Sequence, residues 1–148
     1  VFLFLLERLG YDVAYISGVD TDRFGADLLR NYKVFLSVGH DEYWSGKQRQ
    51  NIEDARDKGL HLAFFSGNEV YWKVRYEGSI DSSKTSHRTL VCYKETWDNA
   101  NIDPSGEWTG VWRDNRLRFS ARPENELTGT IFLVNRGKNL SLPKIHFL

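Results

Sequence analysis

Two apolar segments of similar length flank a polar stretch, and this order constrains the fold more than any other feature of the sequence. The segments KVFLSV (33–38) and LHLAFFS (60–66) are apolar on both faces, as strands inside a parallel sheet usually are. Between them, Ser45 with Gln48 three residues later forms a capping box, and Gly59 stands where the helix should end. The sequence therefore predicts a βαβ unit.

Weaker signals extend this alternation on both sides of the unit. Apolar residues at helical spacing predict a helix over residues 1–9 with Gly10 as its C-terminal cap, and a second, short helix over residues 22–31. Further strands are predicted at residues 12–17, 88–96 and 129–134. Together these elements predict an α/β fold with an open, mostly parallel sheet, helices on both faces and additional strands in the second half.

Length and charge limit the number of domains and the classes of partner. With 148 residues and 41% hydrophobic content, the chain can bury one core but hardly two, so we expect a single domain over residues 1–148. The formal net charge is zero and the two signs are interspersed, which disfavours nucleic acid and anionic membranes as partners. The apolar opening before Glu7 is far too short to span a membrane.

The sulfur-containing residues add two expectations. Cys92 is the only cysteine, which excludes an intrachain disulfide and a cysteine-rich metal site; it does not fix the compartment, although the cytoplasm is slightly favoured. The sequence contains no methionine, and the residues after 134 trail off without a closing element, so we expect a fragment of a longer protein.

Each apolar segment is followed by a glycine, a glutamate and a Tyr-Trp pair, in SVGHDEYWSG (37–46) and FFSGNEVYWK (64–73). Ligands of open parallel sheets bind at the carboxyl ends of the strands, where both pairs are predicted to lie. If the strands are neighbours, their backbones are about 5 Å apart and Tyr43 and Tyr71 could converge. Two interpretations stay open: aromatic packing with exposed hydroxyl groups, or two phenolate ligands for a hard ion such as ferric iron.

A strand followed by a sharp turn can also present a nucleophile. Ser66 occupies such a position, but the sequence lacks the second glycine of a G-x-S-x-G elbow. Cys92 falls within a predicted strand and is better explained as a small buried hydrophobic residue. Neither residue is favoured as a nucleophile.

Three motifs together, GHDEYWS, FFSGNEVYW and GEWTGVWR, resemble the C-terminal region of the N,N-dimethylformamidase large (beta) subunit family over about residues 3–134. The resemblance implies a class I glutamine amidotransferase-like, flavodoxin-related α/β domain that carries a mononuclear ferric ion, Fe(III). Matched motif by motif, the implied ligands are Tyr43, Tyr71 and Glu107. Glu95 and Glu124 are the alternatives for the third ligand.

The same resemblance implies a hydrolase that acts on the C–N bond of a small linear amide. Two phenolates and one carboxylate would balance the charge of Fe(III) and leave positions for water and substrate. His40 and Glu69 are candidates for a general base or for orienting a ligand, and Asn68 is a candidate donor to a carbonyl oxygen. For His40 and Asn68, a local role in the turn is the alternative.

Other function classes and assemblies stay open at this point. The chain could be a catalytically inactive amidotransferase-like module that binds a ligand or scaffolds a larger protein, or its exposed tryptophans could bind carbohydrate. The family's catalytic subunit works with a small partner subunit. We therefore expect a homo-oligomer or a complex with such a subunit, acting on a small-molecule amide substrate.

Overall fold

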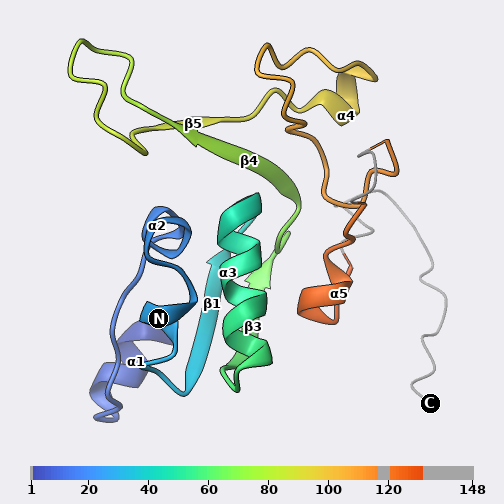
Figure 1. Ribbon diagram of the computed structural model, residues 1–148. Helices are drawn as coiled ribbons and strands as arrows, with labels where there is room; N and C mark the ends of the chain where they lie inside the picture. Colours follow the sequence, from blue (N-terminus) through green and yellow to red (C-terminus); the bar gives the residue numbers. More distant parts are fainter. Residues whose placement is uncertain (1, 117–120, 132–148) are drawn as a thin grey trace, which may run out of the picture.

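The computed structural model describes residues 2–116 and 121–131, and it shows an α/β protein (Figure 1). The helices are α1 (Phe2–Arg8), α2 (Gly18–Leu29), α3 (Gly46–Asp57), α4 (Glu95–Asp98) and α5 (Asn125–Thr128). The strands are β1 (Val34–His40), β2 (Tyr43–Ser45), β3 (His61–Gly67), β4 (Trp72–Glu77) and β5 (Thr89–Val91). No helix among the described residues is long and apolar enough to cross a membrane.

The predicted βαβ unit is confirmed. Strands β1 and β3 pair in parallel from Val34 opposite His61 to the end of both strands. Helix α3 lies between them in the sequence, and it begins where the Ser45 hydroxyl accepts a hydrogen bond from the N–H of Gln48 at 2.9 Å. It ends just before Gly59, whose φ of +106° is a conformation that glycine adopts without strain.

A second sheet, in the order β2-β4-β5, was not predicted. Strand β4 pairs in parallel with β2 and antiparallel with β5. The sequence does indicate strand β4, because three apolar residues alternate with charged ones along WKVRYE (72–77). The described residues therefore form two small sheets in place of the single open sheet expected from the sequence.

Three predicted strands differ from the structure or lie outside it. Residues 12–17 form no strand, because no segment among the described residues offers them a ladder of backbone hydrogen bonds. The strand predicted at 88–96 is limited to β5, since Lys94 takes the left-handed conformation and α4 begins directly after it. Of the strand predicted at 129–134, residues 129–131 form no strand and residues 132–134 lie outside the described residues.

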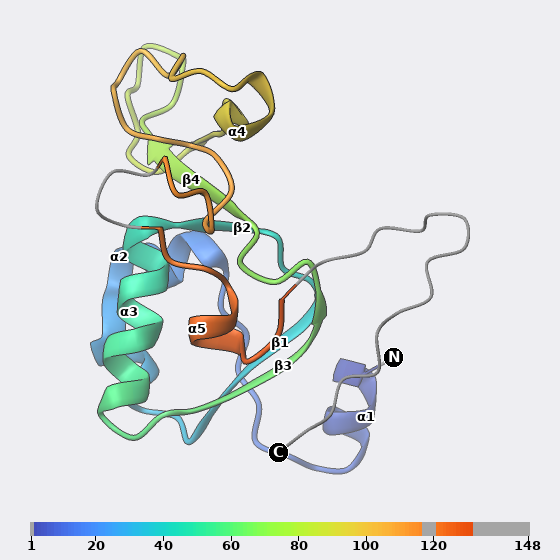
Figure 2. The ribbon, with the colours of Figure 1, turned by 90° about the vertical axis from the view of Figure 1, so that its right-hand side faces the viewer.

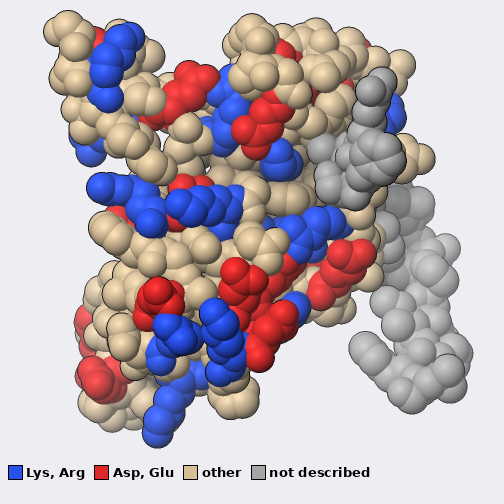
Figure 3. Space-filling view, viewed as in Figure 1, with Lys and Arg blue, Asp and Glu red and all other residues tan. Residues whose placement is uncertain are grey.

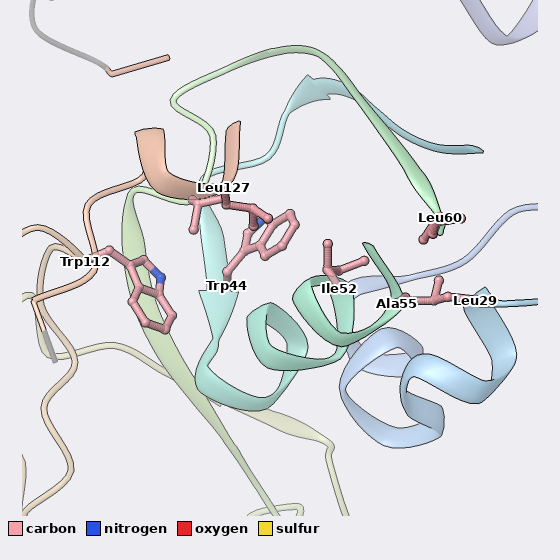
Figure 4. Packing of buried hydrophobic residues seen from close by; sticks show 8 residues of the cluster. Leu29, Trp44, Ile52, Ala55, Leu60, Trp112 and Leu127 are labelled. Atoms are coloured by element: carbon pink, nitrogen blue, oxygen red, sulfur yellow. The ribbon is translucent and has the colours of Figure 1, made fainter. Parts of the chain in front are cut away.

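The main hydrophobic cluster lies between α3 and one face of the β1-β3 sheet (Figure 4). Trp44 and Leu127 meet in its centre, while Ile52 of α3 packs from the helix side. Along β3, Phe64 packs against this cluster, whereas Phe65 points the other way, is 57% exposed and contacts the ring of Phe2 in α1. The two-sided burial expected for these strands is therefore wrong: Phe35, Leu62 and Phe64 pack, partly buried, against the cluster on one face, while Phe65 on the other face is exposed.

The surface carries both signs of charge. Figure 3 shows basic and acidic side chains next to one another across the face that includes α3 and α5, as the interspersed charges of the sequence indicate. Figure 2 shows that β4 and α4 lie at one end of the molecule and that α1 lies at the other. The two Tyr-Trp motifs lie where these two regions join.

Candidate functional site

The two Tyr-Trp motifs are held side by side by backbone hydrogen bonds. The Glu42 carbonyl accepts from the N–H groups of Tyr71 at 3.1 Å and of Trp72 at 2.8 Å. Strands β2 and β4 then begin together, with Tyr43 directly opposite Trp72. The two motifs are therefore neighbours, and the tyrosines are offset from one another by one position.

Within each pair the tryptophan packs and the tyrosine stays accessible. Trp44 is completely buried in the main cluster, and Trp72 is 2% exposed. Tyr43 is 37% exposed, and Tyr71 is half-buried. Aromatic packing thus accounts for the two tryptophans, while the tyrosines, one exposed and one half-buried, are the members of the motifs that solvent or a ligand can reach.

A cationic side chain contacts each of the three predicted metal ligands. The pairs are Lys94 with Tyr43 (Nζ to ring centroid 5.7 Å), Arg113 with Tyr71 (Cζ to ring centroid 5.3 Å) and Lys73 with Glu107 (Nζ to Oε1 2.7 Å). None of these cations was predicted as a site residue, although Lys73 ends the stretch FFSGNEVYWK and Arg113 ends GEWTGVWR. A metal ion at these oxygens would compete with all three, because like charges repel.

Glu95, one alternative for the third ligand, is fully occupied by backbone donors. Its side chain is completely buried, and it accepts hydrogen bonds from the N–H groups of Ile102 (2.6 Å), Asp103 (2.8 Å) and Thr109 (2.7 Å). Such a carboxylate holds the loop over residues 101–110 in place. Its observed role is structural.

The remaining two glutamates have different connections to the tyrosines. Glu124 is 1% exposed, and its Oε1 lies 2.9 Å from a terminal nitrogen of Arg113, the residue that contacts the Tyr71 ring. Glu107 is exposed and is joined to β4 through Lys73. Among the described residues, no group of three or more His, Cys, Asp or Glu side chains is arranged to hold a metal ion. A metal site here would depend on the tyrosine oxygens.

The turn before Tyr71 is strained. Asn68 has a φ of 56° and Val70 a φ of 53°, and both lie in the left-handed region. Asparagine tolerates this conformation, but a β-branched residue rarely adopts it. Complete burial of the Val70 side chain in the main cluster holds it there. The turn carries the half-buried Glu69, and Tyr71 follows it directly.

The other candidate catalytic residues lie at the ends of β1 and β3. The ring of His40 lies against Gly67, so closely that a Cβ on this glycine would be 3.2 Å from the histidine Cδ2. Ser66 is 3.0 Å from the hydroxyl of Ser37, which donates to Asp41 at 2.7 Å. Ser66 thus belongs to a hydrogen-bond chain of two hydroxyls and a carboxylate, with no histidine in it.

Cys92 is half-buried in the sheet region of β4 and β5. Burial raises the pKa of its thiol, which is therefore protonated at neutral pH. This agrees with its interpretation as a small hydrophobic residue.

A surface hollow of about 460 Å³ opens beside Tyr71. It is lined by Thr96, Val111, Arg113, Asp114, Asn115 and Arg116 in addition to the tyrosine. Ligand sites for small molecules typically begin at about 300 Å³, so the hollow is large enough for a small substrate. A second hollow, of about 370 Å³, lies at the opposite ends of β1 and β3 and contains none of the predicted site residues.

A buried ion pair supports the loop that carries Glu107. The Arg75 guanidinium donates to both carboxylate oxygens of Asp103, at 3.0 and 2.7 Å. Burial alone would raise the pKa of Asp103, but hydrogen bonds from Arg75 and from Ser105 outweigh it and lower the pKa to about 2. The charged form of Asp103 is therefore part of the folded state.

This ion pair predicts a loss of stability in acid. The unfolded pKa of an aspartate is about 3.9, so Asp103 should contribute about 2 kcal/mol above that pH and lose it as the pH falls towards 2. Urea unfolding between pH 6 and pH 2.5 measures the effect, with Asp103→Asn as the comparison. An equally steep pH dependence in the variant would contradict the assignment.

The chain matches known proteins over most of its length. A family model described as "N,N-dimethylformamidase beta subunit-like, C-terminal" matches residues 1–145. The N,N-dimethylformamidase beta subunit of Paracoccus aminophilus is 30% identical over 128 residues, which are 84% of this chain and 16% of that protein. The N,N-dimethylformamidase beta subunit of Alcaligenes sp is 31% identical over 123 residues, which are 81% of this chain and 15% of that protein. The chain thus spans less than a fifth of the curated relatives it matches.

The family match covers all three sequence motifs and both Tyr-Trp pairs. The resemblance identified from the motifs is confirmed by it and by the two relatives. The chain belongs to the N,N-dimethylformamidase beta subunit-like, C-terminal family.

Proposed function

We propose that this protein is a hydrolase of a small amide, related to N,N-dimethylformamidase, and that it uses Fe(III) bound by Tyr43, Tyr71 and Glu107. The adjacency of the two Tyr-Trp motifs in a chain that belongs to this family is the observation that carries the proposal. The donor set fits the ion, because two phenolates and one carboxylate are hard oxygen ligands with three negative charges.

The residues around this set have separate roles in the proposal. When bound, the ferric ion would supply a Lewis acid for the amide carbonyl or lower the pKa of a bound water. The hollow beside Tyr71 holds the amide, and Glu69 or His40 takes a proton from water. Asn68 donates a hydrogen bond to the carbonyl oxygen. Lys73 would leave the carboxylate of Glu107, and Lys94 and Arg113 can stay over the rings of Tyr43 and Tyr71, because they contact the rings rather than the phenol oxygens.

The proposal extends to the fold and the assembly. The parallel β1-β3 unit, with the candidate site at its carboxyl end, agrees with an amidotransferase-like, flavodoxin-related sheet, of which these strands would be the central part. The relatives are named as subunits. We therefore include a homo-oligomer or a complex with a small partner subunit in the proposal.

A second candidate function is a binding or scaffold module without turnover. The observation that favours it is the cation at each predicted ligand: Lys73 already balances the charge of Glu107, and Lys94 and Arg113 lie over the rings of the two tyrosines. Release of an amine and a carboxylate from small amides, N,N-dimethylformamide among them, decides between the two functions. Turnover above the rate of a Tyr43→Phe, Tyr71→Phe double variant supports the hydrolase, and equal rates support the module.

The identity of the third ligand can be tested with two matched variants. Glu107→Gln should lose iron while its stability changes by less than about 1 kcal/mol, because the Lys73–Glu107 pair is exposed on the glutamate side. Glu124→Gln should keep iron and lose stability, because its buried carboxylate pairs with Arg113. Iron content per chain and urea unfolding are measured for both. The opposite pattern of iron loss would assign the ligand to Glu124.

The role of Asn68 can be separated from its backbone conformation. Asn68→Gly keeps the left-handed conformation and removes the side chain, so the fold should be retained while amide hydrolysis falls about 100-fold. Asn68→Ala should in addition cost about 1 kcal/mol of stability. Full activity in the glycine variant would show that Asn68 serves the turn alone. Turnover rates and unfolding curves of both variants make the comparison.

A further inference from the structure

Three aromatic rings and one ammonium group gather at the start of β2 and β4, on the face that carries Tyr43 and Trp72. Lys94 Nζ lies 4.9 Å from the ring centroid of Trp72 and 5.7 Å from that of Tyr43. The Trp97 ring has its centroid 5.9 Å from that of Trp72. Figures 1 and 2 place α4, which carries Trp97, at the same end of the molecule as β4. We call Tyr43, Trp72, Trp97 and Lys94 the aromatic site.

The position of Lys94 shows that this place attracts a cation. The faces of aromatic rings carry negative charge, and an ammonium group within about 6 Å of a ring centroid is attracted to it. In the described part of the chain, no carboxylate oxygen lies within 4.0 Å of the Lys94 ammonium. The rings are therefore its observed partners. Its backbone lies in the left-handed region, with a φ of 52°.

Trp97 adds a third ring at the edge of the site. It is 74% exposed, the highest value among the tryptophans, and its ring contacts Trp72. It therefore extends the aromatic surface of Trp72 beyond the place that Lys94 now fills. Rings arranged around a cation are the usual way in which proteins recognise methylated ammonium groups.

We propose that the aromatic site binds methylated ammonium ions, which take the place of the Lys94 ammonium. Trp72 and Trp97 are not among the proposed metal ligands. Tyr43 is one of them, but the face of its ring attracts a cation whether or not its oxygen binds iron. One link rests on the proposed function: hydrolysis of an N-alkyl amide releases an amine that is protonated at neutral pH, and such an ion belongs to this ligand class. The site would then receive the amine product next to Tyr43.

The test uses protein labelled with 5-fluorotryptophan, so that each of the five tryptophans gives its own fluorine resonance. Tetramethylammonium chloride is titrated against sodium chloride at equal concentration and against tert-butanol, which has methyl groups but no charge. The Trp97→Phe variant assigns the Trp97 resonance. We expect the resonances of Trp72 and Trp97 to shift and saturate with tetramethylammonium only, while those of Trp44 and Trp112 stay in place.

Two variants complete the test. Lys94→Gln should bind tetramethylammonium roughly 3-fold more tightly because the competing ammonium is gone, and Trp97→Ala should bind it more weakly by a similar factor. The absence of a saturable shift, an equal shift with tert-butanol, or unchanged affinity in Lys94→Gln would overturn the proposal. The titration is done on protein from which iron has been removed with a chelator, because Fe(III) at Tyr43 is paramagnetic and would broaden the resonance of the neighbouring Trp72. The result is then independent of iron, so failure of the iron proposal would not be mistaken for failure of this one.

Discussion

The Tyr43→Phe variant is expected to lose its iron and at least about 100-fold of its amide hydrolysis while its fold stays intact. Phenylalanine keeps the ring that contacts Lys94 but offers no oxygen to a metal ion. Tyr43 is 37% exposed, so loss of its hydroxyl should change the free energy of unfolding by about 1 kcal/mol at most. Iron content, turnover and urea unfolding of the same preparation test all three statements.

A matched control is available at the other end of the sheet. Tyr32 is similarly exposed, at 47%, and lines the hollow that contains none of the predicted site residues. Tyr32→Phe should therefore keep both iron and activity. If Tyr43→Phe behaves like this control, Tyr43 is not a ligand, and the non-catalytic module becomes the better account of the protein.

Replacing Arg49 with methionine should destabilise the protein by about 3 to 5 kcal/mol, because it breaks a buried ionic and hydrogen-bonded network. Arg49 is completely buried in α3. It donates to Glu53 (2.9 Å) and to the carbonyls of Arg122 (2.5 Å) and Pro123 (3.2 Å), and its guanidinium lies 4.8 Å from the ring centroid of Trp112. Methionine fills much of the space but leaves these acceptors without their donor.

The effect should extend to the candidate site. The backbone N–H of Trp112 donates to the backbone carbonyl of Tyr71 at 3.0 Å. The segment that Arg49 holds against α3 therefore also positions this tyrosine. Arg56→Met is the control on the same helix, since Arg56 pairs with an exposed Asp57 and should cost less than about 1 kcal/mol. Urea unfolding measures both variants. A loss below 1 kcal/mol in Arg49→Met would show that the network contributes little.

The parts of the fold that could be predicted are those with local signals. Helix α3 and strands β1 and β3 follow from apolar periodicity, the Ser45 cap and Gly59. Helix α1 likewise ends at Gly10, whose N–H bonds to the Glu7 carbonyl at 3.0 Å. These signals act within a few residues, so one sequence is enough to read them.

The parts that were missed depend on contacts between distant segments. Strand β2 has only three residues and exists because β4 pairs with it, and the sequence does not specify that register. The predicted strand at 12–17 failed for the opposite reason, since its composition suits a strand but no partner is present in the described residues. Tertiary pairing decides both cases.

The tyrosines of the candidate site could be predicted from the sequence, but the cationic side chains that contact the predicted ligands could not. The Tyr-Trp repeat identified two stretches that the structure brings together. The cations at Tyr43, Tyr71 and Glu107 come from residues that are distant in the sequence from their partners, by 34 positions or more in each case. No local pattern marks such partners.

The proposed iron site at Tyr43 and Tyr71 is best tested by the iron content and absorption spectrum of the purified protein. Protein from iron-replete cells should contain stoichiometric iron and be coloured by tyrosinate-to-iron charge transfer in the visible range. The band should disappear in Tyr43→Phe and Tyr71→Phe. A colourless, iron-free preparation from such cells would contradict the claim.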